Sequence, residues 1–203
     1  MMESSERIIL KSIELFTRYG IRLVTMDQIA EEVGMSKRTI YELFKDKDTL
    51  VMECLESIHR KQMTEIQEIA ERVSNVIEAL YRVGQYSEKK KAEMNPIFFE
   101  DIRKLYPQIW NTMKQRSNTG SGMFSHMILT KGIGEGIFRD DLDITIVGTF
   151  MQSMMETFHK KEIFPENTPD KALLRNIVIP YYMGISTDKG KKLIEQYIPL
   201  TFS

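Results

Sequence analysis

The chain has 203 residues, of which 42% are hydrophobic and 28% charged, and its net charge is −1. A chain of this length can bury a sizeable core in one or two domains. It has no apolar run near the 18 residues that a membrane-spanning helix needs, and residues 1–6 do not resemble a signal peptide. Cys54 is the only cysteine, which excludes an internal disulfide and a thiolate metal cluster. We therefore expect a soluble, cytoplasmic protein that does not bind a membrane.

Two short helices joined by a glycine turn are predicted within residues 25–47. Thr25 and Gln28 have the spacing of a capping box, in which each side chain satisfies a free backbone N–H of the other residue. Gly34 is expected to adopt the left-handed conformation that ends a helix and lets the chain reverse. Ser36 is a good N-cap for the second helix.

The second of these helices is expected to have an apolar and a polar face. Ile40, Leu43 and Phe44 are expected to face the first helix. The residues that remain to face outward are Lys37, Arg38, Thr39 and Tyr41. A short helix that presents such side chains suits insertion into the major groove of DNA. The alternative is an ordinary helical hairpin with solvated outer charges, because such hairpins are common.

The charge balance argues against a broad basic surface. Residues 1–50 contain 8 Lys and Arg against 9 Asp and Glu, whereas residues 34–47 contain four cations against two anions. The free N–H groups at helix N-termini can add to this local attraction for phosphate. Attraction to DNA is therefore expected to be local, and an architectural DNA-binding protein would need a more basic chain.

Three segments between Arg7 and Leu50 match a known pattern: I-I-L-K-S-I-E-L-F-T-R-Y-G, V-T-M-D-Q-I-A-E-E-V-G-M-S-K-R-T-I-Y-E-L-F and K-D-K-D-T-L. This part of the chain resembles the DNA-binding domain of the tetracycline-repressor (TetR) family. The close resemblance covers the first quarter of the chain, and the remainder, including G-I-F-R-D-D-L-D at residues 136–143, matches more loosely. The residues that match the family's DNA-contacting positions are Thr25, Ser36, Lys37, Arg38, Thr39, Tyr41 and Lys47.

The resemblance implies two kinds of DNA contact. Lys37, Arg38 and Thr39 are expected to reach base edges. Phosphates are expected to be held by Thr25, Tyr41 and Lys47.

Beyond residue 50 the pattern predicts long amphipathic helices and no strands. Helices are expected at residues 47–73, 74–91, 141–161, 169–186 and 189–198, with two more starting at Asn95-Pro96 and Pro107. Pro180 should remove one backbone hydrogen bond from the penultimate helix and kink it. The expected fold is all-α, with an N-terminal three-helix helix-turn-helix DNA-binding domain at residues 1–50 and a larger C-terminal helical ligand-binding and dimerisation domain at residues 51–203.

A stretch rich in methionine and aromatic residues marks the expected ligand site. Seven of the fourteen methionines lie within residues 94–155, and methionine can re-pack around varied apolar guests. Ser117 and Gly120 form a small-residue notch, for which close helix packing or a break in the helix is the alternative explanation. The resemblance implies a cavity for a small apolar or amphipathic effector. The candidate ligand-binding residues are Phe98, Trp110, Met113, Ser117, Gly120, Phe124, Met127, Met151 and Met155.

No catalytic or metal-binding constellation is visible in the sequence. His59, His126 and His159 are too scattered for H-x-x-x-H spacing. The segment G-I-G-E-G at residues 132–136 is similar to a phosphate loop, but Ile137 stands where that loop needs glycine. We therefore expect no enzyme activity, no cofactor and no bound metal.

The sequence as a whole predicts a transcriptional repressor that a small molecule releases from its operator. A homodimer on a near-palindromic site of double-stranded DNA is expected, because one short recognition helix covers few bases. The alternative is a regulator without a small-molecule pocket, which responds to a protein partner or acts as an activator. The expected dimer interface lies on the helices at 141–161 and 169–186, through Met151, Met154, Phe158, Leu173, Ile177 and Tyr181.

Overall fold

A computed structural model describes residues 4–160 and 163–202 of the chain. Within these residues the protein is helical and contains no strand, apart from an isolated antiparallel bridge between Phe138 and Ser186. The predicted all-α fold is therefore confirmed. No helix in this part of the chain is long and apolar enough to cross a membrane.

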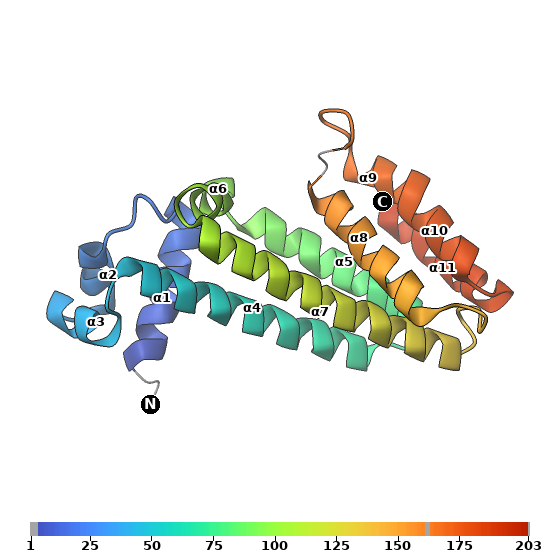
Figure 1. Cartoon of the computed structure of the whole chain (residues 1–203), viewed down its shortest axis with the longest axis horizontal. Helices are drawn as coiled ribbons and strands as arrows, with labels where there is room; N and C mark the ends of the chain where they lie inside the picture. Colours follow the sequence, from blue (N-terminus) through green and yellow to red (C-terminus); the bar gives the residue numbers. More distant parts are fainter. Residues whose placement is uncertain (1–3, 161–162, 203) are drawn as a thin grey trace. The chain divides into compact units, whose positions relative to one another are not determined.

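The helices follow one another with short connections (Figure 1). In chain order they are α1 (Ser4–Tyr19), α2 (Met26–Val33), α3 (Lys37–Leu43), α4 (Lys47–Arg72), α5 (Val76–Glu93), α6 (Pro96–Leu105), α7 (Pro107–Gly134), α8 (Ile144–Lys160), α9 (Asp170–Leu173), the π-helix η1 (Leu174–Val178), α10 (Ile179–Ile185) and α11 (Asp188–Phe202).

The chain divides into two compact units. Unit 1 comprises residues 1–67 and 86–116, and unit 2 comprises residues 68–85 and 117–203. Helices α4, α5 and α7 contribute residues to both units. Unit 1 includes α6 as well as the first three helices, so it is larger than the DNA-binding domain expected at residues 1–50. That boundary stays a prediction.

The core of unit 1 holds the first three helices together. Ile8 and Phe16 of α1, Ile29 of α2 and Ile40 of α3 are completely buried in one apolar cluster. Each such side chain contributes roughly 1.5–3 kcal/mol when it is removed from water. Helix α6 completes the cluster, through Ile102 among others. The short helices α2 and α3 are thus fixed by a core that reaches well beyond them.

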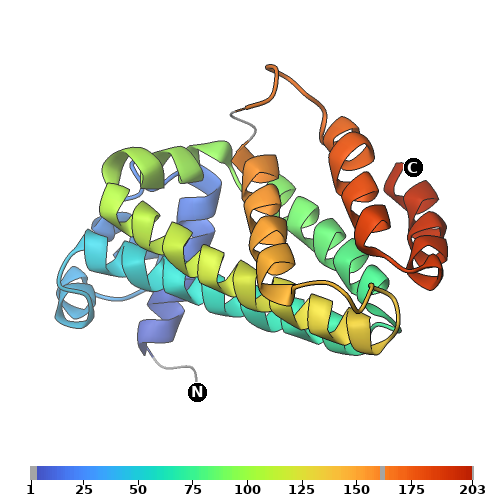
Figure 2. The ribbon, with the colours of Figure 1, turned by 45° about the vertical axis from the view of Figure 1, so that its right-hand side comes forward.

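Unit 2 has a separate core, to which Leu129 of α7, Met151 of α8 and Tyr182 of α10 contribute. Helices α10 and α11 lie side by side in both ribbon views (Figures 1 and 2). Just before Pro180 the chain forms the π-helix η1, in which the N–H of Ile179 donates to the Leu174 carbonyl, five residues back. A π-turn is one of the usual ways to accommodate a helix irregularity. The helix is therefore irregular just before Pro180, and the kink expected there stays a prediction.

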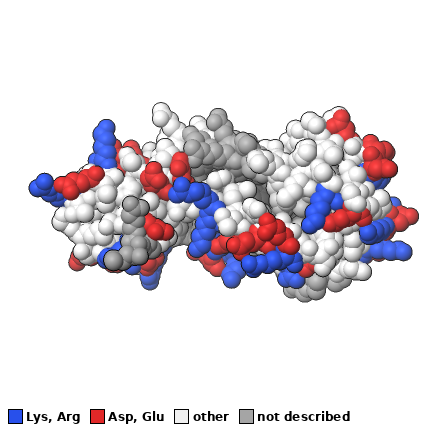
Figure 3. Space-filling view, turned by 90° about the horizontal axis from the view of Figure 1, so that it is seen from below, with Lys and Arg blue, Asp and Glu red and all other residues white. Residues whose placement is uncertain are grey.

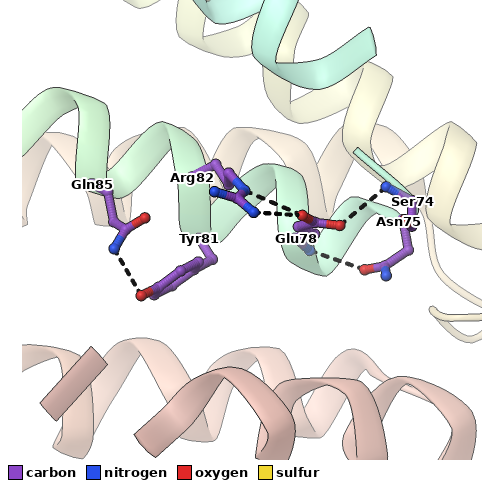
Figure 4. Close-up of polar contacts among 6 residues, drawn as sticks. All are labelled: Ser74, Asn75, Glu78, Tyr81, Arg82 and Gln85. Carbon is purple, nitrogen blue, oxygen red and sulfur yellow. Dashed lines mark hydrogen bonds and ion pairs between the residues drawn. The ribbon is translucent and has the colours of Figure 1, made fainter. Parts of the chain in front are cut away.

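The start of α5 in unit 2 carries a row of polar contacts (Figure 4). The Glu78 carboxylate accepts the N–H of Ser74 at 3.1 Å, and Arg82 donates to it through Nε and Nη2, each at 3.1 Å. The Asn75 side chain accepts the N–H of Glu78 at 2.9 Å. These bonds satisfy backbone donors that the first turn of a helix leaves free. The hydrogen bond from Ser74, with Arg82 beside it, lowers the pKa of Glu78.

Candidate DNA-binding surface

Helix α2 is closed at both ends by its predicted caps. Thr25 Oγ1 accepts the N–H of Gln28 at 3.2 Å, and the Gln28 side chain accepts the N–H of Thr25 at 2.8 Å. Gly34 follows the helix with φ 64° and ψ 37°, and its N–H donates to the last carbonyls. This conformation is left-handed, which favours glycine. The capping box and the glycine turn are both confirmed.

Helix α3 starts at its predicted N-cap, but one of its residues expected to be buried is exposed. Ser36 Oγ accepts the N–H of Thr39 at 3.1 Å. Ile40 and Phe44 are buried, whereas Leu43 is 46% exposed, so the expectation that Leu43 faces the first helix is wrong. The helix stops after Leu43, and Phe44 has an extended backbone with φ −128° and ψ 107°. That turn of the chain carries Phe44 into the core and leaves Leu43 outside.

Most of the predicted DNA-contacting side chains lie on the surface of the first helices. Lys37, Arg38 and Tyr41 are exposed on α3, and Ser36 is exposed at its N-terminus. Thr39 is half-buried, and its hydroxyl lies 2.8 Å from the Ser36 hydroxyl. Of the seven predicted residues, Thr25 and Lys47 lie outside the α3 segment: Thr25 is exposed at the N-cap of α2, and Lys47 is the first residue of α4.

Both cations of α3 are paired with carboxylates. The Lys37 ammonium lies 2.6 Å from the Asp27 carboxylate of α2, and this hydrogen bond raises the pKa of Lys37. Arg38 Nε donates to Glu42 Oε1 at 2.8 Å, one helical turn away. On the face that Figure 3 draws, basic and acidic side chains lie next to one another at the end that carries α1–α3. The surface is therefore one of paired charges.

Asp27 and Glu42 were not among the residues predicted to act at this surface. The Arg38–Glu42 pair has the i,i+4 spacing that stabilises helices, and that spacing can be recognised in the sequence. The Lys37–Asp27 pair joins two helices, so it depends on how α2 packs against α3.

Lys47 is half-buried and engaged inside unit 1. Its ammonium donates to the Ile21 carbonyl at 2.6 Å and lies 6.0 Å from the centre of the Phe16 ring. Burial lowers the pKa of Lys47, and the nearby Asp101 opposes this shift. An ammonium has three N–H donors, so a phosphate contact remains compatible with the contact to Ile21. That phosphate contact stays a prediction.

Helix α6 holds the connection between α1 and α2. The buried Asp101 carboxylate accepts the N–H of Arg22 at 2.8 Å, and the Asn95 amide donates to the Arg18 carbonyl at 3.0 Å. Gly20 has φ 84°, and a Cβ on it would lie 2.6 Å from Ile97 of α6. The close approach and the left-handed backbone both require glycine here. Nothing in the sequence pattern indicated that Asp101 reaches across 79 residues to this connection.

The described members of the predicted ligand set lie in two different cores. Phe98 and Trp110 pack in the core of unit 1. Phe124 and Met151 pack in the core of unit 2. Met127 and Met155 are 40% and 38% exposed, respectively. The ligand-binding role of these residues stays a prediction.

The other three candidates, Met113, Ser117 and Gly120, lie among residues 112–121, whose side chains are outside the described part of the structure. The backbone of α7 is helical throughout, so the notch is not a break in the helix. At Gly122 an added Cβ would lie 3.0 Å from Oε1 of Gln152 in α8. This glycine therefore allows close packing of two helices.

A surface groove of about 610 Å³ lies in unit 1, where the start of α4 faces the junction of α6 and α7. Asp46, Asp48, Met52 and Tyr106 contribute to its lining, and none of the predicted ligand residues does. Burial, with Asp48 nearby, raises the pKa of Tyr106 to about 12. Among the described residues no group of three or more His, Cys, Asp and Glu is placed to hold a metal ion.

Two capped helices, a left-handed glycine between them and an exposed second helix define a helix-turn-helix DNA-binding protein. Residues 8–54 match the family model described as "Bacterial regulatory proteins, tetR family". Over these residues the chain is similar to the DNA-binding part of this family of transcriptional regulators.

Two relatives are similar to this chain over aligned segments of different length. The HTH-type transcriptional regulator YerO of Bacillus subtilis is 38% identical over 71 residues, which cover 35% of this chain and 25% of YerO. The HTH-type transcriptional repressor KstR2 of Mycobacterium tuberculosis is 26% identical over 143 residues, which cover 68% of this chain and 70% of KstR2.

The solved structure of KstR2 shares the fold with a TM-score of 0.51, at 20% identity over 93% of this chain and 97% of that one. The fatty acid degradation regulator FadR from Bacillus halodurans covers the same shares with a TM-score of 0.60, at 14% identity. These structures share both the N-terminal helix-turn-helix and the C-terminal helical part.

Proposed function

We propose that the protein is a repressor that binds a specific DNA site and is released from it by a small apolar or amphipathic molecule. The observation that carries the DNA-binding part is the exposed face of α3, which Ser36 caps and which follows α2, the helix that Thr25 caps. Lys37 and Arg38 lie in its first turn, and the first residues of a recognition helix are those that contact base edges. In this proposal Tyr41, Thr25 and Lys47 contact phosphates.

Two observations support a repressor that senses a ligand. The relative that aligns over two thirds of this chain, KstR2, is named a transcriptional repressor. The same fold occurs in a protein described as a gamma-butyrolactone receptor, with a TM-score of 0.61. The methionine- and aromatic-rich helices of this chain offer an apolar or amphipathic molecule adaptable surroundings.

A homodimer is part of the proposal, and exposed apolar side chains on α8, η1 and α10 are its candidate interface. Ile146 and Phe150 are one turn apart on α8 and are 68% and 54% exposed. The Phe150 ring lies 5.2 Å from the ring of Tyr181, and Ile177 is 38% exposed one turn before Tyr181. Exposed apolar groups that adjoin in this way indicate a protein contact.

Other members of the expected interface are not available to a partner. Met151, Met154 and Leu173 are buried within the chain, so they do not belong to the candidate surface. Phe158 is half-buried against the core of unit 2. Ile177 and Tyr181 stay in the candidate surface, and Ile146 and Phe150 are added to it.

The decisive experiment is selection of DNA from a random duplex pool with the purified protein. Enrichment of two half-sites related by a two-fold axis, together with a dimer in light scattering, is the expected result. A monomer that enriches no sequence would refute the proposal. An apolar ligand library is then screened for loss of binding to the selected site, where a coupling of about 1–3 kcal/mol reduces affinity roughly 5- to 150-fold. A protein that no small molecule releases would instead be a regulator controlled by a protein partner.

A further inference from the structure

We propose that Glu42 is a positioning residue that orients Arg38 to read a guanine in the major groove. The inference rests on the proposed DNA-binding function. It assigns one base, guanine, to the side chain of Arg38. Glu42 acts through Arg38 and touches no base itself.

The geometry of the pair carries the inference. Arg38 uses Nε to donate to Glu42 Oε1 at 2.8 Å, and in the described part of the chain it makes no other hydrogen bond. Its two terminal amino groups, Nη1 and Nη2, therefore remain available. They lie on the outer edge of the planar guanidinium, opposite the atoms that attach it to the chain.

Arg82 shows the contrasting arrangement in the same molecule. It donates to Glu78 through both Nε and Nη2, so the carboxylate occupies one complete side of its guanidinium (Figure 4). That pair is a structural contact at the start of α5. The Arg38 pair differs because the carboxylate takes only Nε, and the paired amino groups that form a fork stay unused.

Guanine is the base that fits this fork. It presents two acceptors, O6 and N7, to the major groove, and arginine binds them with two parallel N–H donors. The side chain of Arg38 is 88% exposed, so without a restraint it would sample many rotamers. A hydrogen bond to Glu42 limits that freedom before DNA arrives, which reduces the entropy cost of the base contact.

Glu42 also makes DNA complexes in which Arg38 contacts no base less favourable. Its carboxylate is repelled by DNA phosphates, so a complex in which Arg38 gains no base contact carries that repulsion without compensation. The side chain of Glu42 is 60% exposed, and α3 is anchored through the buried Ile40. Replacing Glu42 should therefore change selectivity and leave the fold intact.

Lys37 and Asp27 do not form an equivalent reader. The lysine ammonium is a compact charge without the planar fork, and its partner comes from α2. The inference is therefore restricted to Arg38 and Glu42.

The test starts from the site that the wild-type protein selects from the random duplex pool. Each G·C pair of a half-site is exchanged for A·T, and one exchange is expected to weaken wild-type binding about 10- to 100-fold. Glu42→Ala should reduce this discrimination to less than about 3-fold and tighten binding to random DNA. Glu42→Gln keeps an oxygen acceptor and should retain part of the discrimination. Arg38→Lys keeps the charge but loses the fork, and should abolish it.

A double-mutant cycle shows whether Glu42 acts through Arg38. In an Arg38→Ala background, Glu42→Ala should have no further effect on discrimination at that base pair. The matched control is Glu68→Ala. Glu68 also pairs with an arginine four residues away, Arg72, but at the C-terminal end of α4. This control should leave discrimination unchanged, and melting curves of all variants should match the wild type.

Three results would overturn the inference. Unchanged base preferences in Glu42→Ala would show that Glu42 does not orient Arg38. A loss of discrimination that persists without Arg38 would show that Glu42 contacts a base directly. If the loss of affinity on exchange of each G·C pair for A·T were the same with and without Arg38, guanine would be rejected as the base. Selection of no sequence at all by the wild type would refute the proposed function instead, so the two failures are distinguishable.

Discussion

Lys47 is placed where one side chain stabilises the fold and is also proposed to bind DNA. In Lys47→Met the unbranched stem is kept and the ammonium is lost. The Ile21 carbonyl then loses a charged donor at 2.6 Å, a bond of a kind worth about 1.5–3 kcal/mol. Half-burial lowers the pKa of Lys47, because it desolvates the charged ammonium. This desolvation offsets part of the stabilisation that the hydrogen bond to Ile21 provides. We therefore expect a loss of about 1.5 kcal/mol, at the lower end of that range.

The assay is urea unfolding, combined with titration of the selected DNA site at several salt concentrations. Lys45→Met serves as the control for stability, because Lys45 is exposed. If Lys47 also holds one phosphate, the slope of log affinity against log salt should fall in magnitude by about 0.9 for each half-site. Equal stability of the Lys47 and Lys45 variants would refute the structural role, and an unchanged slope would refute the phosphate contact.

Three further predictions concern other parts of the chain. Gly34→Ala should destabilise the protein by about 1–2 kcal/mol in thermal unfolding, because φ is 64° although a Cβ meets nothing within 4 Å; Gly34→Asn, which tolerates this conformation, should cost less. Glu78→Gln should melt below the wild type at pH 7. The lowered pKa of Glu78 gives stability that is present above its usual value of 4.5 and is lost as pH falls through its lower folded value, so the two melting curves should converge in acid. Phe150→Glu should give a monomer in light scattering, since the ring is 54% exposed in the candidate interface.

The local features of the first helices were readable from the sequence because they depend on neighbours within four residues. The capping box at Thr25, the left-handed Gly34 and the N-cap at Ser36 are all of this kind. Leu43 was misplaced because periodicity assumes that a helix continues, whereas α3 ends at that residue. The pattern assigned both Leu43 and Phe44 to the buried side, and the extended backbone at Phe44 brings only Phe44 into the core.

The contacts that hold the α1–α2 connection were not predictable in the same way. Asp101 reaches Arg22 across 79 positions, and Lys47 reaches Ile21 across 26. In a one-dimensional pattern Asp101 is one of two adjacent acidic residues, Glu100 and Asp101, on an amphipathic helix. Its burial follows only from the packing of α6 against α1. The sequence could not separate pocket from core for a related reason, because methionine and aromatic residues are equally suited to fill a core.

The surface proposed to bind DNA depends on the rest of unit 1 for its rigidity. Helices α2 and α3 have eight and seven residues, and helices that short are unstable in isolation. Their caps satisfy only some of the free backbone groups, so the buried Ile29 and Ile40 must supply the remaining stability from the core. Arg38 can then hold a fixed position although its own side chain is almost fully exposed. In the proposed complex, selectivity for a base thus depends on core packing, on two helix caps and on one carboxylate, while the chain as a whole stays close to neutral.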